Sequence, residues 1–205
     1  MAVTKSADPI SNIVTAVQAA MSNYQIVQHD KRLGDTFHEA GRKLTLIDNA
    51  LSTIQTKTQG DIAQAASTSL ESCNITATSL ETIFKKVSEA PIDERQQSYE
   101  AYIGPNGKSN LVEALAVKMM EHIRTLATEC DMEKENERQL LVELQAEIKK
   151  LQDLKPSVPI EQKVANHFLN PGNGNQFNAA GGTQNNATGS GSQFSGVTFT
   201  GAVTF

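Results

Sequence analysis

Apolar residues recur at steps of three and four along most of the first 160 residues, a spacing that places them on one face of an α-helix. The first such stripe follows Asp8 and Pro9, which favour the N-cap and the first position of a helix. It consists of Ile10, Ile13, Val14, Val17, Met21 and Tyr24. The opposite face is polar, and no charged residue occurs between Asp8 and Asp30. We therefore predict an amphipathic N-terminal helix with an uncharged polar face.

Two longer stripes follow, and each is bounded by residues that end or begin helices. The second stripe ends before Gly60 and consists of Leu33, Phe37, Ala40, Leu44, Ile47, Leu51 and Ile54. The third lies between Asp61, a candidate N-cap, and Pro91, and it consists of Ala66, Leu70, Cys73, Ala77, Leu80, Phe84 and Val87. A short helix is expected over residues 92–103.

Beyond a turn at residues 104–107, Ser109 is predicted to cap a helix with a stripe of Leu111, Leu115, Met119, His122 and Leu126. Charged residues 131–138 precede a last stripe of Leu141, Leu144, Ile148 and Leu151, and Pro156 and Pro159 close the helical part. Helices that are apolar on one side must bury those sides against each other. The expected fold is all-α, a bundle of about five or six helices over residues 1–160.

Residues 170–205 have a different pattern. They contain eight of the 13 glycines, a composition that makes a helix unfavourable. A Gly-Asn-Gly-Asn-Gln-Phe segment at 172–177 recurs 17 residues later as Gly-Ser-Gly-Ser-Gln-Phe at 189–194. Near the end, four apolar residues fall on one side of an extended strand: Val197, Phe199, Val203 and Phe205. A repeat of this size suggests stacked equivalent units.

The absence of charge in this tail favours cross-β stacking. No Asp, Glu, Lys or Arg follows Lys163, so copies would not repel one another along a fibril axis. Amide side chains can form ladders, and the phenylalanines can fill a dry interior. We predict a linker over residues 161–171 and a tail over 172–205, disordered when soluble and a β-solenoid amyloid when assembled. The alternative interpretation of these residues is a disordered Gly/Asn linker. The predicted amyloid core consists of Gln176, Phe177, Gly181, Gly182, Thr183, Gln184, Asn185, Gln193, Phe194, Phe199, Val203 and Phe205.

Composition narrows the function. The formal net charge is −5, from 18 basic and 23 acidic residues, and no basic stripe suits a nucleic-acid backbone, so we expect no nucleic acid partner. No stretch is long and apolar enough for a membrane-spanning helix, and no signal peptide is expected. Cys73 and Cys130 occupy apolar positions and are interpreted as buried free thiols. A cytoplasmic protein is the default expectation.

No catalytic, cofactor-binding or metal-binding residue can be assigned. The Gly-Pro-Asn-Gly-Lys-Ser segment at 104–109 has two residues between its glycines, where a phosphate-binding loop has four. The four histidines show no metal-ligand spacing. We therefore expect a protein that is not an enzyme and needs no cofactor.

The tail resembles the fungal sigma motif, an amyloid signalling element on NACHT-type receptors and on the effectors that they activate. The resemblance rests on the run at residues 173–186, the Gln-Phe segment at 189–194 and the Phe-Thr-Gly-Ala-Val-Thr-Phe end at 199–205. More loosely, the Phe-His-Glu-Ala-Gly-Arg-Lys-Leu run at 37–44 and the Pro-Ser-Val-Pro run at 156–159 resemble the SesA domain. That domain is similar to the HeLo-like group of fungal cell-death domains.

These resemblances imply an effector of programmed cell death in fungal non-self recognition, of the heterokaryon-incompatibility type. A NACHT-type receptor with its own sigma motif would be the partner, and it would template self-assembly of the tail. The helical domain would then move from the cytoplasm to the plasma membrane and act there through its N-terminal helix. The membrane-active residues of that helix would be Ile10, Ile13, Val14, Val17 and Met21, although at rest we expect this stripe to be core.

Two other hypotheses remain open at this stage. The helical domain could be a non-toxic adaptor that binds a further helical protein and is localised by its tail. An enzyme with an unrecognised site is a weaker hypothesis, which nucleotide binding by the 104–109 turn would support.

Overall fold

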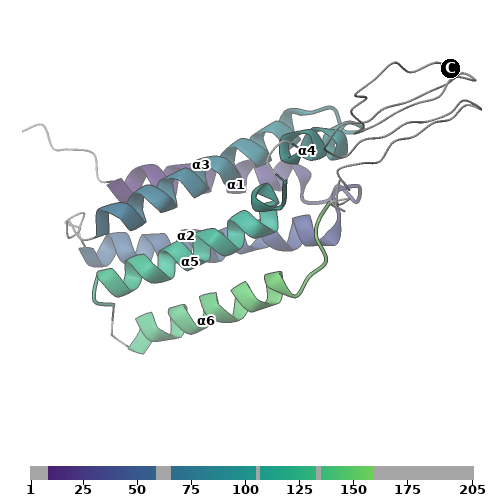
Figure 1. Cartoon of the computed structure of the whole chain (residues 1–205). Helices are drawn as coiled ribbons and strands as arrows, with labels where there is room; N and C mark the ends of the chain where they lie inside the picture. Colours follow the sequence, from purple (N-terminus) through teal and green to yellow (C-terminus); the bar gives the residue numbers. More distant parts are fainter. Residues whose placement is uncertain (1–8, 59–65, 105–106, 133–134, 159–205) are drawn as a thin grey trace, which may run out of the picture. The chain divides into compact units, whose positions relative to one another are not determined.

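The computed structural model describes residues 9–58, 66–104, 107–132 and 135–158, and this part of the chain is all-helical (Figure 1). Its α-helices are α1 (Pro9–Val27), α2 (Asp35–Thr58), α3 (Ser67–Glu89), α4 (Arg95–Ile103), α5 (Val112–Glu129) and α6 (Glu135–Gln152). A 3-10 turn, η2 (Gly107–Asn110), precedes α5. The prediction of an all-α bundle is confirmed. Residues 161–205, which contain the predicted linker and tail, lie outside the described residues.

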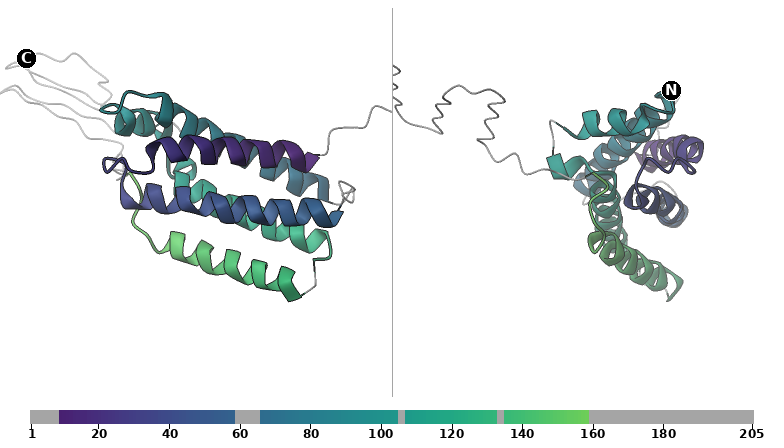
Figure 2. Two further views of the ribbon diagram at one scale, coloured as in Figure 1. Left: turned by 180° about the vertical axis from the view of Figure 1, so that it is seen from behind. Right: turned by 90° about the vertical axis from the view of Figure 1, so that its right-hand side faces the viewer.

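Four helices form the centre of the bundle. α1 packs against α2 and α3, and α5 also packs against α2 and α3, so these four helices close a ring. The two views in Figure 2 show their axes running roughly along one direction. The short α4 packs on α3, and α6 lies against α5 and α2 at the edge of the ring. Helices aligned in this way can interdigitate their side chains along their full length.

The predicted apolar stripes form the core. On α2 and α3 every stripe residue within the described helices is buried, and Leu33 is buried just before α2 begins. The largest rings gather at one end of the bundle, where Phe37 lies edge-on to Phe84 and to Tyr99 with centroids 5.3 and 4.9 Å apart. Burial of this apolar surface is the main force that holds the helices together.

The start of α5 differs from the sequence prediction. Ser109 lies within the 3-10 turn η2, and the N-cap position is occupied by Leu111, which makes no side-chain cap hydrogen bond. The backbone N–H of Val112 is instead bonded by the hydroxyl of Tyr99, 3.0 Å away on α4. The prediction that Ser109 caps α5 was wrong, because a side chain from another helix takes the place of a local cap. The two other predicted caps, Asp8 and Asp61, lie outside the described residues, and the α-helices that follow them begin at Pro9 and Ser67.

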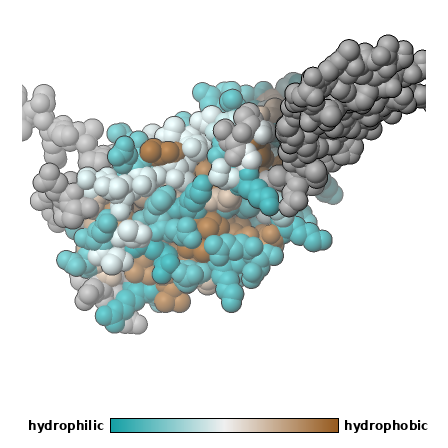
Figure 3. All heavy atoms as spheres, viewed as in Figure 1, coloured by the Kyte–Doolittle hydropathy of each residue, from teal (hydrophilic) through white to brown (hydrophobic). Residues whose placement is uncertain are grey.

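α6 is attached by polar contacts as well as by its stripe. The ammonium of Lys43 on α2 lies 2.6 Å from Glu147 on α6 and 2.6 Å from Glu39, and all three side chains are largely buried. The visible face over α5 and α6 is mostly hydrophilic, whereas the surface over α3 is near neutral (Figure 3). None of the described helices has the length and hydropathy to cross a membrane.

Candidate functional site

The five residues predicted to act at a membrane lie in the core of the bundle. Ile10, Ile13 and Val17 are at most 1% exposed. Val14 and Met21 are half-buried and pack against the same core. In this structure the stripe of α1 therefore holds the bundle together, as expected for the resting protein, and its membrane role stays a prediction.

The opposite face of α1 is exposed and carries no charge. It presents Asn12, Thr15, Gln18, Ser22 and Gln25. Its hydroxyls bond the helix's own backbone: Thr15 donates to the Ser11 carbonyl at 2.8 Å, and Ser22 donates to the Gln18 carbonyl at 2.9 Å. A hydroxyl that already has a partner loses less on leaving water than an unpaired one. This face would therefore be easier to desolvate than a face of lysines and glutamates.

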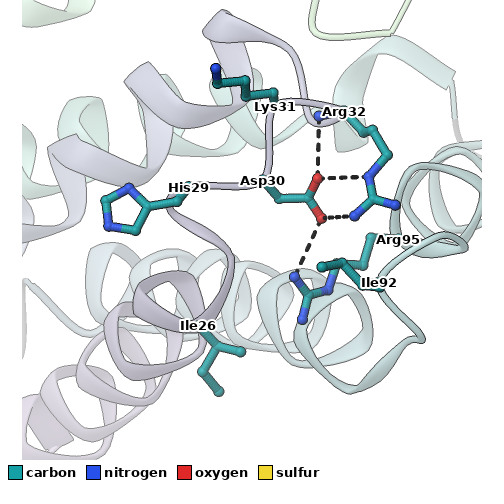
Figure 4. Close-up of a pocket in the computed structure, with 7 residues that line it drawn as sticks. All are labelled: Ile26, His29, Asp30, Lys31, Arg32, Ile92 and Arg95. Atoms are coloured by element: carbon teal, nitrogen blue, oxygen red, sulfur yellow. Dashed lines mark hydrogen bonds and ion pairs between the residues drawn. The ribbon is translucent and has the colours of Figure 1, made fainter.

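The loop between α1 and α2 is organised around Asp30, whose side chain is only 3% exposed. Its carboxylate accepts bonds from the backbone N–H of Arg32 at 3.2 Å and from Nε and Nη2 of the same arginine at 2.8 and 3.0 Å. Arg95 at the start of α4 donates from Nη1 at 3.3 Å (Figure 4). The Arg32 bonds in particular hold the pKa of Asp30 below its usual value. The loop is thereby fixed to α4.

The same loop is fastened to the core through His38. Its Nε2 lies 2.9 Å from the carbonyl oxygen of Asp30, and the Tyr24 hydroxyl donates to the His38 carbonyl at 3.1 Å. The Tyr24 ring in turn packs edge-on against Phe84 with centroids 5.6 Å apart. Burial raises the pKa of the Tyr24 hydroxyl. Sequence reasoning placed no function here, because the contacts join residues that no motif links.

A pocket of about 400 Å³ opens beside this loop, a size in the range of small-ligand sites. We call it the Asp30 pocket; it is lined by Ile26, His29, Asp30, Lys31, Arg32, Ile92 and Arg95 (Figure 4). Ile26 and Ile92 are 61% and 60% exposed. No sequence pattern indicated this pocket, because its lining comes from the end of α1, the following loop, the segment before α4 and the first residue of α4.

The end of the described chain is bound to the starts of two helices. Ser157 donates from its backbone N–H and from its hydroxyl to the two carboxylate oxygens of Glu113, at 2.8 and 2.7 Å. The Tyr99 hydroxyl lies 2.7 Å from the Ser157 hydroxyl and accepts from the Val112 N–H. We call these four residues the Ser157 clasp. Beside it, Thr36 of α2 donates to the carbonyl of Lys155 at 2.7 Å.

Comparison with known protein families shows which family the chain belongs to. A family model described as the N-terminal domain on NACHT NTPases and P-loop NTPases, SesA, matches residues 10–126. The chain belongs to the SesA family. The SesA match covers α1 to α4 and all but the last turn of α5, and it therefore includes the Asp30 pocket. α6 and Ser157 lie beyond it.

A second family model, described as the sigma domain on NACHT-NTPases, matches residues 165–205. The suspected combination of a SesA domain with a sigma motif is confirmed. No curated protein and no solved structure matched the chain. Both matched families occur on NACHT-type NTPases, so this SesA protein is a NACHT-associated signalling module.

The twelve predicted amyloid-core residues all fall within the sigma match but outside the described residues. They are Gln176, Phe177, Gly181, Gly182, Thr183, Gln184, Asn185, Gln193, Phe194, Phe199, Val203 and Phe205. Their role in cross-β stacking stays a prediction, and so do the domain boundaries after residues 160 and 171.

Proposed function

We propose that this SesA protein is a non-enzymatic effector of fungal programmed cell death, activated when a NACHT-type receptor templates its sigma tail into amyloid. The receptor's own sigma motif supplies open strand ends, to which copies of the tail add. Assembly gathers many helical domains at one place and raises their local concentration. The helical domains then act at the plasma membrane through α1, having been cytoplasmic at rest.

The uncharged character of α1 is the observation that carries this proposal. Its 19 residues include no Asp, Glu, Lys or Arg. Its apolar stripe can bury in lipid as it buries in the bundle, and its exposed hydroxyls keep their partners within the helix. The acidic net charge of −5 gives no general attraction to anionic lipid, so the membrane step depends on apolar surface.

The core position of α1 also explains why activation would be required. Ile10 and Val17 are fully buried, so the apolar face of α1 reaches lipid only if α1 leaves α2 and α3. Replacing these buried residues by Asp would not test the idea, because an unpaired carboxylate in the core would itself unfold the bundle. Charges on the exposed face avoid this difficulty, since water solvates them in the resting bundle and lipid does not.

The test is co-expression of the full chain with a NACHT-type receptor bearing a sigma motif, with cell death and fluorescent tail assemblies as readouts. The variant Thr15→Asp/Ser22→Asp charges the exposed face of α1. The matched control, Thr53→Asp/Thr56→Asp, charges exposed positions on α2 whose hydroxyls make the same kind of bond. We expect both variants to assemble, the control to kill and the α1 variant to fail. Killing by the α1 variant would refute the role of α1.

Clustering without death in the unmodified chain would favour the adaptor hypothesis instead. In that case the tail would recruit the SesA domain, and the domain would bind a further helical protein. Recruitment of the fluorescent chain to the plasma membrane separates the two, because only the effector proposal requires it.

A further inference from the structure

The Asp30 pocket combines cations with exposed aliphatic side chains. Ile26 and Ile92 lie on opposite sides below the Asp30 carboxylate, and Arg95 stands beside Ile92 (Figure 4). Both isoleucines are more exposed than not, although comparable residues of the core stripes are buried. Aliphatic side chains that stay exposed beside cations suit a ligand that has an apolar part and an anionic group.

The lining has more positive than negative charge. Lys31, Arg32 and Arg95 contribute three cations against the single carboxylate of Asp30, which leaves an excess of two. Asp93 lies near enough to act on Arg32, but it is exposed and does not line the pocket. Water screens an exposed charge more strongly than a buried one. A doubly charged anion therefore matches the excess charge of the lining.

The guanidinium of Arg95 makes fewer hydrogen bonds than that of Arg32. Arg32 holds Asp30 through two side-chain bonds and one backbone bond, whereas Arg95 reaches it through one bond of 3.3 Å. The Arg95 side chain is only 13% exposed, and its buried Nε has no hydrogen-bond partner among the described residues. A buried guanidinium with an unsatisfied donor is stabilised by a further anion. Lys31 and His29 sit on the exposed loop and can turn toward such a ligand.

We propose that the Asp30 pocket binds a phosphate monoester, with the apolar part of the ligand against Ile26 and Ile92. A phosphate monoester carries nearly two negative charges at neutral pH, as the lining requires. It can come from a lipid head group, phosphatidic acid, or from a soluble phosphate ester. The two exposed isoleucines favour the lipid, because they would enter the interface beside the head group.

This inference goes beyond the proposed function. It concerns the folded bundle and needs neither assembly of the tail nor release of α1. A chain that binds phosphatidic acid without killing, or kills without binding it, would therefore separate the two proposals.

The experiment measures sedimentation of the freshly purified monomeric full chain with vesicles. The vesicles are phosphatidylcholine alone, or with phosphatidylserine or phosphatidic acid added to equal molar content. We expect binding to phosphatidic acid to exceed binding to phosphatidylserine. Lys31→Gln should weaken binding to phosphatidic acid about five-fold, because one cation near an anionic surface contributes about that much. Ile26→Ser/Ile92→Ser should weaken it as well. Circular dichroism checks that each variant is folded.

Matched control variants test the position of the site. Lys85→Gln removes a cation that is 59% exposed on α3, and Ile75→Ser removes an isoleucine that is as exposed as Ile26. Neither should change binding. Calorimetry with glycerol 3-phosphate forms the soluble arm: binding that Lys31→Gln weakens, without vesicle binding, would support the site and identify a soluble ligand. Equal binding to both anionic lipids, or equal loss in control and pocket variants, would overturn the proposal.

Discussion

Tyr24 lies across Gly41 so closely that no side chain fits between them. A Cβ atom added at Gly41 would fall within 2.7 Å of three carbon atoms of the Tyr24 ring. The ring cannot easily move, because it is 8% exposed and packs against Phe84 and His38. Gly41 therefore sets how closely α1 approaches α2.

Gly41→Ala should weaken the packing of α1 against α2 without adding a charge. The added methyl group must displace a buried ring, which costs about 1–3 kcal/mol, and the better helix propensity of Ala offsets up to about 1 kcal/mol of that. We expect the free energy of unfolding in urea to fall by about 1–2 kcal/mol. Gly34→Ala is the matched control, since its Cβ would meet only the Ser157 carbonyl oxygen at 3.7 Å. Equal stability of the two variants would contradict this account.

Tyr99→Phe should destabilise the start of α5. It leaves the buried N–H of Val112 without its acceptor and removes one partner of Ser157. An unsatisfied buried N–H costs about 1–3 kcal/mol, which urea unfolding would measure. Tyr102→Phe is the control, because the ring that faces the Lys86 ammonium at 5.2 Å is retained. A Tyr99→Phe variant as stable as this control would mean that the clasp contributes nothing.

Stability should fall in acid through Asp30. Hydrogen bonds from Arg32, and more weakly from Arg95, lower the pKa of the folded carboxyl below the usual value of an aspartate. A lowered folded pKa stabilises the protein above the unfolded pKa, and the effect is lost as pH falls through the folded pKa. The urea concentration at the unfolding midpoint should therefore decrease as the pH is lowered below about 4. Asp30→Asn should be less stable than the wild type at pH 7, and its stability should depend less on pH in this window. Asp153→Asn, at the end of α6, should keep the pH dependence of the wild type.

The two thiols should react very differently. Burial raises the pKa of Cys73 from 9.0 to about 12, so its thiolate fraction near pH 8 falls by about a thousandfold. Cys130 follows α5 and is half-buried. A thiol reagent should modify one cysteine in the native chain and both in denaturant, and Cys130→Ser should abolish the native reaction. Rapid native modification of two thiols would show that the bundle opens more readily than its packing indicates.

The helices could be predicted from the sequence because the apolar residues of each stripe recur at helical spacing. Leu44, Leu80 and Met119 are buried as the pattern predicts. Ser109 illustrates the limit: a serine before an apolar run is a good cap locally, but the hydroxyl of Tyr99 reaches the Val112 N–H from another helix. Local propensity cannot show which of two donors or acceptors the tertiary structure brings closer.

The Asp30 pocket could not be predicted for a related reason. Its cations are common surface residues, and nothing in the sequence links Arg32 to Arg95 before the loop and α4 are placed together. The same holds for the Ser157 clasp, since Ser157 and Glu113 are 44 residues apart. By contrast, the uncharged face of α1 follows from the sequence directly, because a helix fixes which residues share a side.

The Ser157 clasp and the neighbouring bond between Thr36 and Lys155 also impose an order on folding during synthesis. Thr36 meets the Lys155 carbonyl 119 residues later in the chain, and Glu113 must wait for Ser157. At about 5–20 residues per second, a ribosome takes roughly 6–24 s to make the first of these separations. During that interval the starts of α2 and α5 lack partners that the finished protein supplies. The helical domain therefore closes only after its last segment has emerged, so residues 155–158 complete its folding.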